Sequence, residues 1–100
     1  MDISIVIPLL NESESLDELS LKIDSVMKEN SFNYEVIYVD DGSEDNSWEI
    51  INSICNENNS FKAIKFSKNY GKSQALNAGF EIATGNVVFT MDADLQDDPE

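Results

Sequence analysis

The stretch from Tyr34 to Ser43 reads Tyr-Glu-Val-Ile-Tyr-Val-Asp-Asp-Gly-Ser and decides the fold class. Its first six residues favour a buried strand, and the run ends abruptly at the turn-forming residues Asp40-Asp41-Gly42-Ser43. A helical stripe follows, with Trp48, Ile51 and Cys55 recurring at spacings of three and four. A strand that passes through a polar turn into an amphipathic helix is typical of a β-α-β unit and so predicts a parallel sheet.

The same pattern repeats on both sides of this stretch. Strands are predicted at Ser4–Leu10, Tyr34–Val39, Phe61–Phe66 and Val87–Met91. The other two helical stripes contain Leu16, Leu19, Ile23, Val26 and Met27, and then Leu76, Gly79, Phe80 and Ala83, with Gly85 as a C-terminal cap. The order β-α-β-α-β-α-β predicts an α/β fold with a parallel sheet and right-handed crossovers.

Length and charge limit the possible functions. One hundred residues suit one domain, and 20 acidic residues against six lysines give a net charge of -14. This charge argues against nucleic acid or an anionic membrane surface as a non-specific partner. The absence of histidine excludes Ser-His-Asp, Cys-His and His-rich zinc sites. No membrane span or signal peptide is expected, which favours a cytoplasmic location.

Acidic side chains follow three of the four predicted strands. Glu12 follows the first, Asp40 and Asp41 the second, and Asp92 and Asp94 the fourth. Ligand sites in open parallel sheets lie beyond the carboxyl ends of the strands, so these carboxylates are expected to converge and to need a divalent cation or hydrogen-bond donors. Hard oxygen ligands favour Mg²⁺ or Mn²⁺. A solvated turn with a helix cap remains an alternative for both acidic motifs.

Four of the six lysines lie within eleven residues. Lys72 stands beside Gly71 at the start of a predicted helix and is placed to meet an anion. Lys62 and Lys65 are expected to be solvated strand residues. Gly71-Lys72-Ser73 is similar to the end of a phosphate-binding P-loop, but Phe66 stands where that motif requires glycine, which excludes it.

Four motifs, taken together and in order, resemble family 2 glycosyltransferases of the GT-A fold. They are Ile5-Val6-Ile7-Pro8 with Asn11-Glu12, Val39-Asp40-Asp41-Gly42-Ser43, Asn69-Tyr70-Gly71-Lys72 with Ala75-Leu76-Asn77-Ala78-Gly79, and Met91-Asp92-Ala93-Asp94-Leu95-Gln96-Asp97. The run ending at Glu100 looks most like the polyprenyl-phosphate, dolichol-phosphate mannose synthase-like branch. That branch more often has proline at the position held by Asp98. Residues 1–100 then read as the N-terminal, nucleotide-sugar-binding part of one GT-A domain, continuing beyond the Asp-x-Asp motif. The resemblance implies a Rossmann-like, mostly parallel sheet in strand order 3-2-1-4, with the first two helices on one face and the third on the other.

The resemblance implies a UDP- or GDP-sugar donor and assigns residues to it. Asp41 would accept a hydrogen bond from the nucleobase, and Pro8 and Glu12 would line the nucleoside pocket. Lys72 would face the nucleotide, and Asp92 would lie near the ribose and diphosphate. The implied ligands of a bridging Mg²⁺ or Mn²⁺ are Asp92, Asp94 and Gln96.

The resemblance also implies a reaction, namely inverting, metal-dependent sugar transfer to an acceptor such as a polyprenyl phosphate in cell-envelope polysaccharide synthesis. The family's catalytic base lies downstream, so no catalytic residue is assigned here and the isolated chain is expected to be inactive and to self-associate. The resemblance leaves open which sugar is transferred and which nucleobase the donor carries. It also leaves open whether the full-length protein associates with a membrane. Two alternatives remain. One is a non-catalytic nucleotide-binding module, and the other is a haloacid-dehalogenase-like phosphatase, which carries Asp-x-Asp on its first strand with Thr or Val where Gln96 stands.

Overall fold

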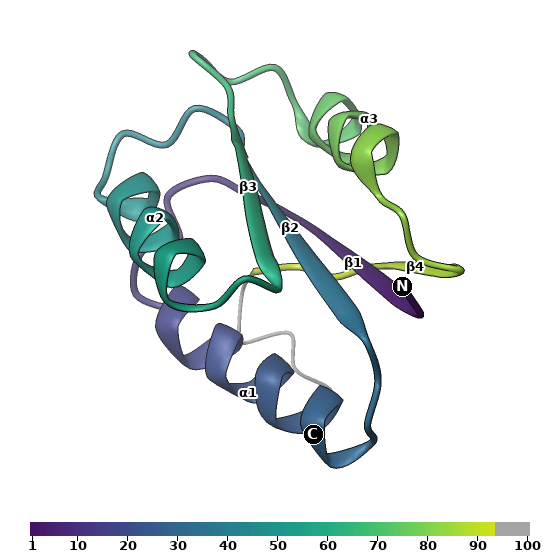
Figure 1. Cartoon of the computed structure of the whole chain (residues 1–100). Helices are drawn as coiled ribbons and strands as arrows, with labels where there is room; N and C mark the ends of the chain where they lie inside the picture. Colours follow the sequence, from purple (N-terminus) through teal and green to yellow (C-terminus); the bar gives the residue numbers. More distant parts are fainter. Residues whose placement is uncertain (94–100) are drawn as a thin grey trace.

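The computed structural model describes residues 1–93 and shows a four-stranded sheet with three helices (Figure 1). The elements are β1 (Ile3–Leu9), α1 (Leu16–Glu29), β2 (Tyr34–Asp40), α2 (Ser47–Glu57), β3 (Phe61–Lys65), α3 (Lys72–Ile82) and β4 (Val87–Thr90). The sheet order is β3-β2-β1-β4, and all three strand pairs are parallel. The predicted α/β fold, strand order and strand positions are therefore confirmed.

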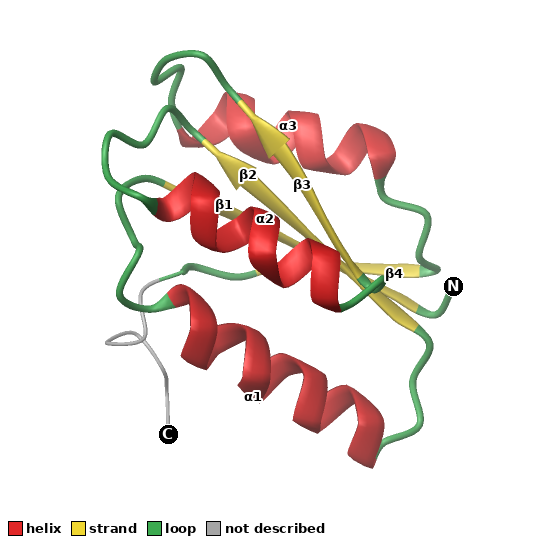
Figure 2. Ribbon diagram, turned by 60° about the vertical axis from the view of Figure 1, so that its left-hand side comes forward, coloured by secondary structure: helices red, strands yellow, loops and turns green. Residues whose placement is uncertain are grey.

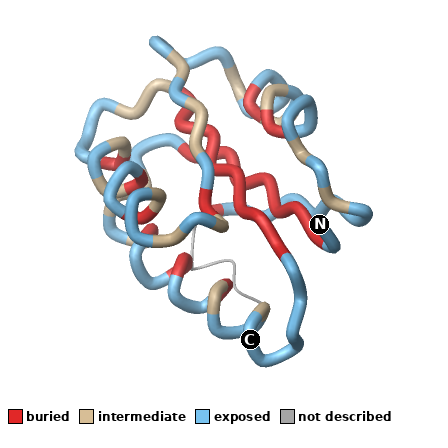
Figure 3. Tube along the Cα trace, in the orientation of Figure 1, coloured by how far each residue is buried: buried red, intermediate tan, exposed pale blue. Residues whose placement is uncertain are grey.

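The helices cover the two faces of the sheet unequally. Helices α1 and α2 lie on one face and α3 on the other, as predicted (Figure 2). The larger core packs side chains of α1 and α2, among them Leu16 and Ile51, against Tyr38 of the sheet. The smaller core places Ala75 of α3 against Val6 and Ile37. Strands β1 and β2 are buried along their whole length because both of their faces are covered (Figure 3). No helix in residues 1–93 is long and apolar enough to cross a membrane.

Two residues predicted on buried helical stripes are exposed instead. Val26 has 49% of its surface exposed, and Phe80 has 45%. On α1 the buried face runs through Ser20, whose hydroxyl lies 2.6 Å from the Tyr38 hydroxyl, and this leaves Val26 at the rim. On α3 the close approach to β1 requires a glycine, because a Cβ at Gly79 would lie 2.3 Å from Val6 Cγ1. The small residues of α3 therefore face the sheet, and Phe80 lies outside.

The assignment of Gly85 as a helix cap was wrong. Helix α3 ends at Ile82, and Ala83 is its C-cap residue. Gly85 lies where the chain enters β4 and approaches β1 so closely that a Cβ would be 2.5 Å from the Ser4 nitrogen. Its backbone N–H donates to Ser4 Oγ at 2.8 Å. The glycine is needed for this close contact between strands.

Strand β4 is an exposed edge within the described residues and presents apolar side chains to solvent. The exposed apolar residues on this strand and directly after it are Val87, Val88, Phe89 and Met91. Such an edge can pair with a second chain. We therefore expect the 11.2 kDa chain to self-associate at micromolar concentration in physiological salt, where screening weakens the repulsion from its net charge of -14.

Sedimentation velocity measures this association. The mean sedimentation coefficient should rise with protein concentration and with salt. Phe89→Lys places a charge on the exposed strand and should shift the population to monomer. A wild-type chain that remains monomeric at all micromolar concentrations would contradict the prediction.

Candidate functional site

A pocket of about 400 Å³ opens beyond the carboxyl ends of β1, β2 and β4, beside the first residue of α3. It is lined by Pro8, Leu9, Leu10, Glu12, Asp41, Asn69, Gly71, Lys72, Asp92 and Ala93. All five residues assigned to nucleotide binding are in this set. Parallel strands deliver their carboxyl ends to one edge of the sheet, which explains how residues 8 to 92 meet there. The remaining predicted site residues, Asp94 and Gln96, lie outside the described residues.

Asp41 is held by the loop between β3 and α3. Its Oδ1 accepts from the Tyr70 N–H at 2.7 Å, and its Oδ2 accepts from the Gly71 N–H at 3.1 Å. These backbone donors offset part of its charge, and the carboxylate is buried. Because an ionised carboxylate offers about four lone-pair positions, one hydrogen bond at each oxygen leaves room for a ligand donor. Asp41 is thus a fixed acceptor at the pocket wall.

Asp40 does not join the pocket, contrary to the expected convergence of acidic residues. It shares the face of Val36 and Tyr38 by strand alternation, on the side of α1 and α2. Its Oδ1 accepts from the Ser43 N–H at 2.8 Å, which closes the turn after β2. Within residues 1–93 no group of three or more Asp, Glu, Cys or His side chains is arranged to hold a metal.

Lys72 and Asp92 form an ion pair at the pocket, with 3.0 Å between Nζ and Oδ1. Lys72 begins α3, and Asp92 follows β4. Lys65 and Lys68 lie elsewhere, 5.7 Å from the centre of the Trp48 ring and 5.3 Å from that of Tyr70, respectively. Lys72 is the only lysine among the described residues that line the pocket.

Asn11 joins the two loops at the pocket, a role that sequence reasoning missed. Its Oδ1 accepts from the backbone N–H groups of Glu44, at 2.8 Å, and Asp45, at 3.3 Å. Its own N–H donates to Ser43 Oγ at 2.8 Å. Asn11 has a φ of 56°, a conformation that asparagine tolerates better than most residues. These bonds hold the loop carrying Glu12 against the turn after β2.

The described part of the proposed metal site suits a hard divalent cation. Asp92 offers carboxylate oxygens, which Mg²⁺ and Mn²⁺ prefer, and half of its side-chain surface is exposed at the pocket. Its negative charge is balanced in this structure by the Lys72 ammonium. A divalent cation could balance the same charge.

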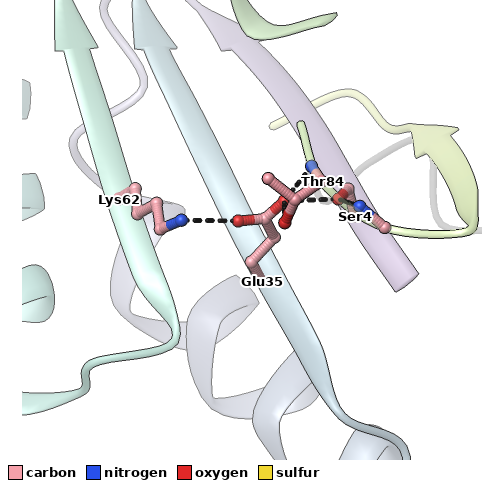
Figure 4. A network of polar contacts seen from close by, with 5 residues as sticks. Ser4, Glu35, Lys62 and Thr84 are labelled. Atoms are coloured by element: carbon pink, nitrogen blue, oxygen red, sulfur yellow. Dashed lines mark hydrogen bonds and ion pairs between the residues drawn. The ribbon is translucent and has the colours of Figure 1, made fainter. Parts of the chain in front are cut away.

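A second polar cluster lies at the opposite, amino-terminal end of the strands and involves a buried carboxylate (Figure 4). The Glu35 side chain is 1% exposed, and Lys62 Nζ lies 2.7 Å from its Oε1. Its Oε2 accepts from Ser4 Oγ at 2.5 Å and from the Thr84 N–H at 2.7 Å. Lys62 is exposed on β3, as expected, but it is also the ion-pair partner of this carboxylate, which its place in the sequence did not indicate.

This cluster holds Glu35 in its charged form. Burial alone would raise the pKa of the Glu35 carboxyl. The hydrogen bonds from Lys62, Ser4 and Thr84 outweigh burial and lower that pKa from 4.5 to about 2. The charged carboxylate joins β1, β2, β3 and the segment before β4, and it does so away from the pocket.

A parallel sheet with a polar pocket beyond its strand ends is the architecture of the nucleotide-binding α/β proteins. Within that class the chain belongs to glycosyl transferase family 2, whose family model matches residues 4–100. The resemblance noted in its motifs is thereby confirmed.

Curated relatives and solved structures agree with this membership. An undecaprenyl-phosphate 4-deoxy-4-formamido-L-arabinose transferase of Pseudomonas fluorescens (strain SBW25) is 46% identical over 99 residues, which are 98% of this chain but only 29% of that protein. The mannosyltransferase PcManGT from Pyrobaculum calidifontis, solved with GDP-Man and Mn²⁺, matches with a TM-score of 0.78 and 25% identity over 92% of this chain and 27% of its own. S. aureus TarS 1-349 with UDP-GlcNAc matches with a TM-score of 0.77 and 28% identity, over 94% of this chain and 27% of its own.

Proposed function

We propose that this chain is the donor-binding part of a glycosyltransferase that moves a sugar from a UDP- or GDP-sugar to a polyprenyl phosphate. The observation that carries the proposal is the pocket, which gathers Pro8, Glu12, Asp41, Lys72 and Asp92 from separate parts of the sequence. The names of the relatives support the acceptor, and the ligands of the solved neighbours support both kinds of donor.

Each pocket residue has a proposed task that its chemistry suits. Asp41, fixed by two backbone donors, accepts a hydrogen bond from the nucleobase of the donor. Pro8 and Glu12 line the nucleoside part of the pocket. Lys72 supplies the positive charge for the diphosphate, and Asp92 lies on the side of the ribose and diphosphate. These residues bind and orient the donor, and the base that activates the acceptor is proposed to come from outside these 100 residues.

The proposed cofactor is Mg²⁺ or Mn²⁺, held by Asp92 together with Asp94 and Gln96. When bound, such a cation supplies Lewis-acid stabilisation of the charge on the departing diphosphate in an inverting transfer. A bound diphosphate would add negative charge beside Asp92, and two like charges about 5 Å apart at an effective dielectric of about 20 repel by roughly 3 kcal/mol. Lys72, which already pairs with Asp92 in this structure, has a single positive charge to set against both groups.

We expect UDP or GDP to stabilise the chain only when a divalent cation is present. Ligand at about ten times its dissociation constant stabilises the fold by roughly 1.4 kcal/mol. For about 100 residues this raises the melting temperature by several degrees, at about 4–8 °C per kcal/mol. Thermal melts with each nucleotide, in Mn²⁺ or in chelator, measure the effect, and Mn²⁺ without nucleotide gives the baseline.

Two matched variants locate the metal dependence. Asp94→Asn should abolish the nucleotide-dependent shift in Mn²⁺, whereas Asp97→Asn, which removes a charge of the same kind three residues further along the sequence, should keep it. Equal shifts in Mn²⁺ and in chelator, or an undiminished shift in Asp94→Asn, would reject the metal assignment and favour a simple turn at Asp92-Ala93-Asp94.

A further inference from the structure

The ion pair between Lys72 and Asp92 joins two groups that are proposed to bind different ligands, one the diphosphate and the other the metal ion. Lys72 is the cation that suits the diphosphate, and Asp92 is the carboxylate that suits the metal. In this structure each neutralises the other across 3.0 Å, and their side chains are 65% and 50% exposed. Exposed pairs of this kind hold each other weakly, so either partner can be exchanged.

We propose that Lys72 is an exchangeable counter-ion. In the free chain its ammonium pairs with the Asp92 carboxylate. When a divalent cation binds Asp92, the ammonium is released and pairs with the diphosphate instead. This inference rests on the proposed function and adds to it a coupling between binding of the cation and binding of the nucleotide. The cation releases Lys72 for the diphosphate, and the nucleotide, by binding Lys72, releases Asp92 for the cation. The coupling is reciprocal, so the cation and the nucleotide raise each other's affinity by the same factor.

The backbone around Asp92 indicates which partner moves. Before it, the Met91 N–H donates to the Val6 carbonyl oxygen at 3.2 Å, and after it Ala93 is buried in the larger core. Asp92 is thus held between two anchored residues. Lys72 carries its charge on a flexible four-carbon stem at the first position of α3, and it can therefore reach a new partner without moving the backbone.

Lys68 provides a matched control for charge. It lies four residues before Lys72, its ammonium is 5.3 Å from the centre of the Tyr70 ring, and it does not line the pocket. Removing its charge changes the general field around the pocket but leaves Asp92 paired. A difference between the variants Lys72→Met and Lys68→Met therefore reports on the ion pair.

The first experiment measures Mn²⁺ binding without nucleotide, from the electron paramagnetic resonance signal of free Mn²⁺. Lys72→Met should tighten Mn²⁺ binding by about two- to fivefold relative to Lys68→Met, the range expected for losing a competing exposed ion pair. In the presence of nucleotide, Lys72→Met should lower the factor by which Mn²⁺ raises nucleotide affinity. Equal Mn²⁺ affinities in the two variants overturn the proposal.

The second experiment follows the side-chain resonances of Lys72 (¹⁵Nζ and ¹³Cε) in the wild-type chain. Mg²⁺ alone should move them to the positions that they have in Asp92→Asn, and UDP or GDP should then move them again, while those of Lys68 stay unchanged. The exchange is overturned if the Lys72 chemical shifts do not change with Mg²⁺, or do not change again when a nucleotide binds with Mg²⁺. Either result leaves the proposed function intact. A wild-type chain that binds no nucleotide with Mg²⁺ or Mn²⁺ overturns both.

Discussion

Replacing Glu35 by alanine is expected to lower the free energy of unfolding by about 2–6 kcal/mol, because the Ser4 hydroxyl and the Thr84 N–H lose their acceptor, at about 1–3 kcal/mol for each buried donor left unpaired. The Glu35 side chain is 1% exposed, and its loss leaves a cavity between β1 and β3. A small domain has only about 5–15 kcal/mol of stability, so urea unfolding should show a large drop in midpoint.

Lys62→Met gives the matched control for this variant. The Lys62 side chain is 47% exposed, so water can replace much of what its ammonium loses. Glu35 would keep its hydrogen bonds from Ser4 and Thr84. Lys62→Met should therefore destabilise the chain clearly less than Glu35→Ala. Equal losses would mean that the ion pair, and not the buried carboxylate with its neutral donors, dominates the cluster.

The lowered pKa of Glu35 predicts that the free energy of unfolding depends on pH. Its pKa is lowered from 4.5 to about 2 on folding, so its contribution is fully present above about pH 4.5 and is lost as the pH falls towards 2. That difference corresponds to on the order of 3 kcal/mol. The stability gap between wild type and Glu35→Gln should shrink over this range, and taking the gap cancels most of the titration of the other acidic groups. A gap that stays constant would show that Glu35 does not titrate as inferred.

The positions and parallel direction of the strands could be predicted from the sequence because hydrophobic runs and stripes are local patterns, whereas their order in the sheet was expected from the family resemblance. Tyr34–Asp40 extends the predicted strand by a single residue. The role of Glu35 could not be predicted in the same way. Its burial depends on Thr84, which lies 49 residues further on and covers the amino-terminal end of the sheet. In a strand that reads Tyr-Glu-Val, a glutamate usually indicates a solvated position.

The pocket residues were predictable as a group because their motifs all stand where a parallel strand ends or a helix begins. The alternation of side chains was less visible. Asp40 and Asp41 are neighbours in sequence, but only Asp41 lines the pocket, since successive side chains of an extended segment point to opposite faces. The pairing of Lys72 with Asp92 also joins residues 20 positions apart. It depends on where α3 begins relative to β4, which no local pattern contains.

Gly42→Ala is expected to lower the free energy of unfolding by about 3–5 kcal/mol, because it combines backbone strain with overpacking. Gly42 has a φ of 84°, a conformation that residues with a Cβ rarely adopt. A Cβ there would also lie 2.5 Å from the Lys68 carbonyl carbon and 2.6 Å from the Asn69 nitrogen. Both contacts are with backbone, so the loop between β3 and α3 would have to move as a whole.

That displacement should reach the pocket, because the next two N–H groups of this loop are the ones that hold Asp41. Gly71→Ala is the matched control. Its φ of 104° imposes strain of about 1–3 kcal/mol, but a Cβ there meets no atom within 4 Å. Urea unfolding should therefore place Gly42→Ala below Gly71→Ala by roughly the 1–3 kcal/mol that overpacking adds. Equal midpoints would show that backbone strain alone sets the requirement for glycine, and that the two loops can separate without loss.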